Sequence, residues 1–188
     1  MNMDKRLLSI VGLVAIGVIG RLLPHLPNAT PITAITLAAQ QYVGRRWSFI
    51  IPIAAMVISD ALIGFYDWRI MMSVYCSFAL IGVLSSLRAK YPGFLTTALV
   101  VISAPLLFFL LTNFAVWLFS PWYAKSIAGL FYCYGLGIPF LRSMLIGDIC
   151  YSTVILGTFE LLPIASFTLR SFYATYKKIP LALRYLHI

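Results

Sequence analysis

Long apolar runs separated by short polar or basic stretches make up most of the chain. A helix that crosses a bilayer needs roughly 20 mostly apolar residues, and somewhat fewer if it is short or broken. The pattern predicts six such helices, at residues 7–23, 32–43, 48–64, 71–88, 94–118 and 141–163. Because only Gly44-Arg45-Arg46 separates the second from the third, these two are expected to form a tight hairpin. The expected fold is an all-α membrane bundle in one domain, residues 1–188.

The composition agrees with this pattern. The chain is 62% hydrophobic and 10% charged, with a mean hydropathy of +0.96, whereas soluble domains carry about 25% charged residues. Most of the surface is therefore expected to face a lipid bilayer.

The basic residues indicate the orientation of the helices. Fourteen Lys and Arg against five Asp and Glu give a net charge of +9, but they cluster between apolar runs, so no nucleic-acid partner is expected. With a cytoplasmic N-terminus, the cytoplasmic side holds Lys5, Arg6, Arg45, Arg46, Arg88, Lys90, Arg170, Lys177, Lys178 and Arg184. The outer side holds Arg21, Arg69, Lys125 and Arg142. This bias predicts that both termini are cytoplasmic, with an amphipathic tail at residues 170–188 lying on the membrane.

The outer connections are longer and more varied than the inner ones. They comprise residues 24–31, 65–69 and 120–140, the last rich in aromatic residues and glycine and expected to be an interfacial or re-entrant segment. Function is therefore expected on the outer side.

Three acidic residues fall within the predicted spans, where ionisable groups are costly and commonly functional. Asp60 and Asp148 either line an aqueous pocket or hold helices together. Glu160 lies near the inner end, where it can pair with an Arg or reach the interface.

Other polar or reactive residues lie near the outer ends of the helices. His25, in a proline-rich loop, either packs that loop or faces a pocket, and Asn113 and Trp117 could line the same cavity. Cys76 follows a polar turn, and it is either a small buried apolar residue or a ligand for a soft metal.

Recognised enzyme and metal motifs are missing from the sequence. Cys76, Cys133 and Cys150 show no paired spacing typical of zinc sites, and HExxH, GxSxG and phosphate-loop patterns are lacking. Binding or transport is therefore favoured over hydrolysis.

Several stretches resemble the substrate-binding (S) components of energy-coupling-factor vitamin transporters, and more specifically the solitary cobalamin S-components called BtuM. The resembling stretches are residues 21–31 (RLLPHLPNATP), 45–47 (RRW), 58–65 (ISDALIGF), 74–81 (VYCSFALI) and 141–148 (LRSMLIGD). The resemblance implies a six-helix protein of the bacterial inner membrane that binds cobalamin at an outward-facing site and imports it, with no other cofactor.

The resemblance also implies roles for individual residues. A thiolate at Cys76 would bind the cobalt from below, which suits a soft metal centre. The residues expected to hold the rest of the ligand are His25, Asn28, Asp67, Tyr75, Asn113 and Arg142. A thiolate on cobalt could also displace cyanide, so cysteine-mediated decyanation of cyanocobalamin is a further hypothesis.

One departure from the family pattern concerns coupling. S-components that dock on a shared energising module carry small residues four apart in the first helix, and the small residues Gly12, Ala15, Gly17 and Gly20 do not form such a pair. Docking on such a module is therefore not expected. Two alternatives stay open: a related transporter for another small ligand, with Cys76 as packing, or a structural membrane protein without a ligand.

Overall fold

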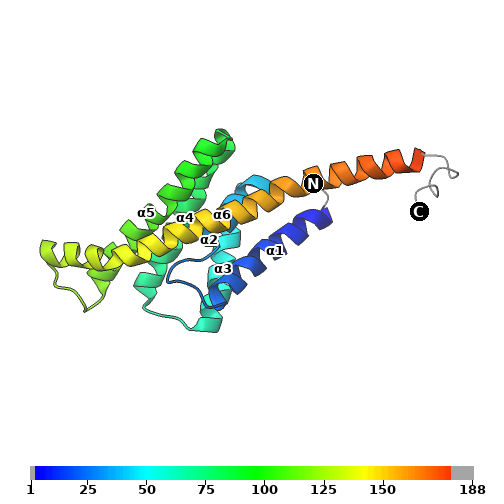
Figure 1. Ribbon diagram of the computed structural model, residues 1–188. Helices are drawn as coiled ribbons and strands as arrows, with labels where there is room; N and C mark the ends of the chain where they lie inside the picture. The colour runs from blue at the N-terminus through cyan, green and yellow to red at the C-terminus, as the bar shows by residue number, and fades with distance from the viewer. Residues whose placement is uncertain (1–2, 179–188) are drawn as a thin grey trace. The chain divides into compact units, whose positions relative to one another are not determined.

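The computed structural model describes the backbone of residues 3–178 and the side chains of residues 3–158 (Figure 1). The regular elements over this part of the chain are all helices: α1 (Met3–Leu22), α2 (Ile32–Ala38), a π-helical turn η1 (Ala39–Val43), α3 (Trp47–Ile63), α4 (Trp68–Lys90), α5 (Phe94–Phe119) and α6 (Ile127–Lys178). The all-α fold class is confirmed. Glu160 and the predicted tail at 170–188 lie outside the residues whose side chains are described.

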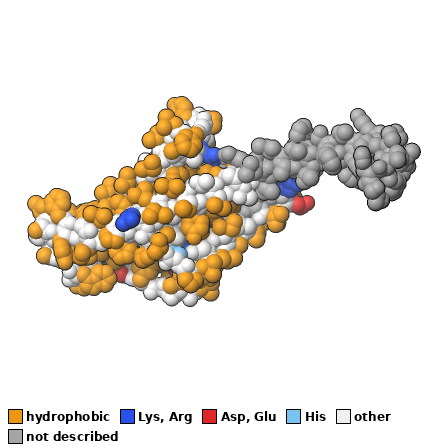
Figure 2. All heavy atoms as spheres, viewed as in Figure 1, with side chains coloured by type: hydrophobic (Ala, Val, Ile, Leu, Met, Phe, Trp, Pro, Cys, Tyr) orange, Lys and Arg blue, Asp and Glu red, His pale blue; other side chains and the backbone are white. Residues whose placement is uncertain are grey.

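Three of the described helices are long and apolar enough to cross a membrane: Trp68–Lys90, Phe94–Phe119 and Ile127–Thr158. Apolar side chains also cover most of the face of the described part shown in Figure 2. The six-span topology and the side of each terminus stay predictions. The chain divides into two compact units, Met1–Ile155 and Leu156–Ile188, and the single domain expected over 1–188 also stays a prediction.

The short second segment lies at the centre of the first unit. Every residue of α2 is buried, because α2 contacts α1, α3, α4 and α5 (Figure 1). The helix widens into η1 and ends at Gly44, whose positive φ of 125° suits glycine. α2 also contacts α3 across this turn, which confirms the predicted hairpin.

The helices α1, α3, α4 and α5 begin and end within four residues of their predicted bounds, whereas α6 (Ile127–Lys178) is much longer than the predicted 141–163. α3 ends at Gly64, which also has a positive φ. α4 begins three residues earlier than predicted because the Asp67 side chain caps it, with Oδ1 accepting a hydrogen bond from Arg69 N at 2.9 Å. α5 packs along α4.

The predicted interfacial segment at 120–140 differs from the structure. Only residues 120–126 form the connection, and α6 begins at Ile127. The Ser126 hydroxyl accepts a hydrogen bond from Gly129 N at 3.1 Å, which supports the first turn. The glycines suggested irregular backbone, but Gly137 instead allows close packing on α5: a Cβ there would lie 2.5 Å from Asn113 Oδ1.

Gly147 and Gly135 on α6 provide a matched pair of substitutions. A Cβ at Gly147 would lie 2.8 Å from Ala29 Cα, whereas a Cβ at Gly135 meets nothing within 4 Å. We expect Gly147→Ala to destabilise the protein by about 1–3 kcal/mol through overpacking. Gly135→Ala should be neutral or stabilise by up to about 1 kcal/mol, because alanine favours the helix.

The measurement is equilibrium unfolding of the two purified variants in the same detergent. Equal stability of Gly147→Ala and Gly135→Ala would contradict the close approach of α6 to the loop at Ala29.

Candidate ligand-binding site

A partly open cavity of about 350 Å³ lies at the end of the first unit where α1 ends and α4 begins. The connection between α1 and α2, the turn between α3 and α4, and side chains of α1 and α3–α6 enclose it. The lining residues are Arg21, His25, Asn28, Thr30, Met56, Ile63, Tyr66, Val74, Phe78, Phe108 and Met144. Polar groups come mainly from the two connections, and apolar groups come from the helices. Such a cavity suits a ligand with a polar part and an apolar part.

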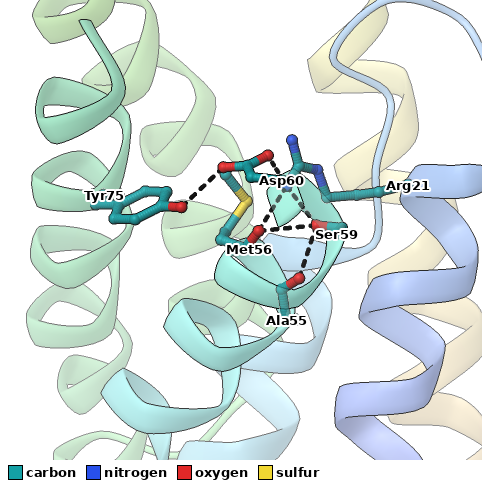
Figure 3. A network of polar contacts seen from close by, with 6 residues as sticks. All are labelled: Arg21, Ala55, Met56, Ser59, Asp60 and Tyr75. Carbon is teal, nitrogen blue, oxygen red and sulfur yellow. Dashed lines mark hydrogen bonds and ion pairs between the residues drawn. The ribbon is translucent and has the colours of Figure 1, made fainter. Parts of the chain in front are cut away.

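A buried ion pair holds one side of this cavity (Figure 3). Arg21 Nη1 lies 2.7 Å from Asp60 Oδ1, and it also contacts Ser59 Oγ at 2.5 Å and the Met56 carbonyl at 3.3 Å. The Tyr75 hydroxyl donates to Asp60 Oδ2 at 2.8 Å. Each oxygen of the buried carboxylate therefore has a donor, and the network joins α1, α3 and α4.

The connection between α1 and α2 forms a tight turn against α1. Ala29 N donates to the Leu26 carbonyl at 2.9 Å, and Asn28 adopts a positive φ of 63°, which asparagine tolerates better than most residues. Gly20 lets the turn approach, since a Cβ there would lie 2.4 Å from Pro31 Cγ. This arrangement places His25, Asn28 and Thr30 on the cavity wall.

Tyr66, in the turn between α3 and α4, supplies a further polar group. Partial burial of its phenol, together with the negative charge of Asp60, raises the pKa of Tyr66 to about 12. The hydroxyl is therefore protonated at neutral pH and can donate a hydrogen bond to a ligand.

Cys76 lies away from the cavity. It is two residues after Val74 and two before Phe78, both of which line the cavity. Each residue of an α-helix turns about 100°, so Cys76 points to the opposite side of α4 from these two. Its side chain is exposed, on the same face as the exposed side chains of Met72 and Leu80.

The other predicted ligand residues have varied positions. His25 and Asn28 line the cavity, and Tyr75 contributes through its hydrogen bond to Asp60. Asp67 does not line it: this carboxylate pairs with Arg69 at 2.9 Å, and the hydrogen bonds from Arg69 lower the pKa of Asp67.

Asn113 and Arg142 also lie outside the cavity lining. Asn113 Nδ2 donates to the Phe109 carbonyl at 2.9 Å, and Arg142 is exposed on α6. Trp117, the other residue expected to line the cavity, instead donates from Nε1 to the Ala124 carbonyl at 2.9 Å. Cys76, Cys133 and Cys150 are all free thiols.

Sequence reasoning missed Arg21 as a functional residue, because it counted this arginine only as a sign of topology. The position of Asp60 near the same end of a neighbouring predicted helix could have indicated the pair, since an intramembrane acid usually has a partner. Tyr66 and the aromatic residues Phe78 and Phe108 were also missed. Nothing in their local sequence separates them from other aromatic residues of apolar helices.

The Arg21–Asp60 pair predicts a large effect on stability. Arg21→Met leaves the Asp60 carboxylate buried without a cation, and the expected loss is about 3–5 kcal/mol. Adding Asp60→Asn should recover most of this loss, because the neutral amide needs no counter-charge. The free energy of unfolding of the single and the double variant is measured in mixed micelles. The control is Arg69→Met, which breaks the exposed ion pair with Asp67. An Arg21→Met variant no less stable than Arg69→Met would contradict the role of the pair.

The chain has no significant match among curated proteins or solved structures. A sequence profile described as "Family of unknown function (DUF6580)" matches residues 1–171, a range that includes every residue lining the cavity. The chain therefore belongs to the DUF6580 family of unknown function.

Proposed function

We propose that the protein is a six-span protein of the bacterial cytoplasmic membrane with both termini in the cytoplasm. The three long apolar helices support membrane insertion. The bias of Lys and Arg toward one set of connections supports the orientation. In this orientation the cavity opens toward the outside of the cell.

We further propose that the protein binds a small ligand in this cavity and imports it, as S-components do. The observation that carries the proposal is the cavity itself, with His25, Asn28 and Tyr66 on its polar side and Val74, Phe78 and Phe108 among its apolar lining. Its volume of about 350 Å³ lies near the lower end of the range for drug-sized ligands. The ligand class that fits is a small compound with an apolar or aromatic body and a hydrogen-bonding head.

The geometry favours such a ligand over cobalamin. A corrin ring with its amide side chains and nucleotide is far larger than a molecule suited to a cavity of about 350 Å³. Cys76 also lies on the helix face opposite the cavity-lining Val74 and Phe78. Cobalt binding by Cys76, and the decyanation that depends on it, stay predictions without support from this geometry.

A purely structural role is the other alternative. A tightly packed outer end of the helix bundle would favour a structural role, and the cavity found there argues against that role. The scaffold hypothesis therefore becomes one of the outcomes of the binding experiment.

The cavity predicts that Val74→Trp blocks ligand binding, because the indole would fill the space. Met72→Trp is the matched control, because Met72 is exposed on the opposite side of the same helix. The measurement is the shift in melting temperature of detergent-purified protein with a panel of water-soluble vitamins and small heteroaromatic amides. A ligand at 100 times its dissociation constant stabilises by about 2.7 kcal/mol.

The expected result is at least one compound that stabilises the wild type and Met72→Trp but not Val74→Trp. A stabilising compound that acts equally on all three would contradict binding in the cavity. Stabilisation by no member of the panel would favour the scaffold.

The cobalamin prediction is tested separately, by the absorbance spectrum of wild-type and Cys76→Ser protein after incubation with cyanocobalamin and desalting. A corrin band that is retained and shifted in the wild type, with the shift lost in Cys76→Ser, would support cobalt binding by Cys76. We expect no retained band in either protein, because Cys76 does not face the cavity.

A further inference from the structure

Asp148 on α6 is a buried carboxylate with no ion-pair partner among the described residues. Its side chain is 1% exposed, and neither Oδ1 nor Oδ2 has a hydrogen-bond partner. The ion pairs found in the described residues, Arg21–Asp60 and Arg69–Asp67, do not include it. An uncompensated charge in such a place is strongly disfavoured.

Two hydroxyl groups flank this carboxylate. Thr33 on α2 lies beside it, and its hydroxyl acts on the carboxylate as a side-chain hydrogen-bond donor, although the contact is longer or more bent than a regular hydrogen bond. Ser152 follows Asp148 by four residues and so lies on the same face of α6. Both hydroxyl oxygens are buried and, like the carboxylate, unpartnered. Four oxygen atoms of these three side chains therefore lack a hydrogen-bond partner.

Other hydroxyls in the bundle behave differently. Thr36 donates to the Ile32 carbonyl at 2.7 Å, and Thr112 donates to the Phe108 carbonyl at 2.8 Å. Such bonds to the preceding turn are the usual way to satisfy a buried helical hydroxyl. Thr33 and Ser152 lack them, so their oxygens are left for another partner.

The cluster lies close to residues that line the cavity. Thr30 and Met144 both line the cavity. Asp148 follows Met144 by four residues on α6, about one helical turn, and Thr33 lies in the first turn of α2, just after the connection that holds Thr30. The close approach of Gly147 to Ala29 brings these two segments together.

We propose that Asp148, Thr33 and Ser152 form a buried sodium site close to the cavity. All the available donors are oxygen atoms, which hard cations prefer. One carboxylate supplies a single negative charge, so a monovalent ion neutralises the site and a divalent ion leaves an excess buried charge. This inference goes beyond the proposed ligand binding, because the sodium site stands whether or not the cavity holds a ligand.

The test is the melting temperature of the full-length protein in detergent without added ligand, in sodium chloride and in choline chloride of equal ionic strength. An ion that binds only the folded state raises the melting temperature. We expect a rise on the order of 2–4 °C in sodium. Asp148→Asn should abolish the rise, whereas Asp67→Asn, which changes an exposed carboxylate, should retain it.

Thr33→Val and Thr36→Val form a second matched pair that tests the site even if Asp148→Asn does not fold. Thr33→Val removes a proposed ligand oxygen and should raise the sodium concentration for half-maximal stabilisation by about tenfold or more. Thr36→Val removes a hydroxyl that is already satisfied and should leave that concentration unchanged. Equal melting temperatures of the wild type in sodium and choline would overturn the proposal and indicate that Asp148 is neutralised by a proton. Retention of the sodium response in Asp148→Asn, or an equal change in the two threonine variants, would also overturn it.

Discussion

The buried pair of Arg21 and Asp60 is the interaction on which the arrangement of α1, α3 and α4 depends. A buried ion pair is stable only when further hydrogen bonds satisfy both partners. Here Ser59 and the Met56 carbonyl complete the guanidinium contacts, and Tyr75 completes the carboxylate (Figure 3). Because Arg21 also lines the cavity, the contacts that hold these helices together also fix one side of the site.

The two buried aspartates illustrate different solutions to the same physical problem. Asp60 has an arginine and a tyrosine as partners, so the protein itself compensates the negative charge of this carboxylate. Asp148 has neither, so its neutralisation depends on the surroundings, through an ion or a proton.

The helices were largely predictable from the sequence, because uninterrupted apolar runs leave little choice: the predicted 94–118 became Phe94–Phe119. The helical conformation of residues 127–140 was not predictable from the sequence. Glycine occurs both in irregular backbone and where helices pack closely, and only the neighbouring helix α5 shows that close packing is the reason here. In the site, His25 was found through its proline-rich loop, and Asn28 through the resemblance to S-components; both line the cavity. The direction of Cys76 was not found, because only two residues, about half a helical turn, separate a residue that faces the cavity from one that faces outward.

The complete burial of α2 has a consequence for how this segment is accommodated in a bilayer. Together α2 and η1 cover residues 32–43, about 18 Å of helix at 1.5 Å per residue, against a hydrocarbon core of about 30 Å. The segment also carries Thr33, Thr36 and Gln40, all buried, which lipid would solvate poorly. It is therefore shorter than the hydrocarbon core, and in a bilayer its polar side chains would depend on the surrounding helices, and not on lipid, for their contacts.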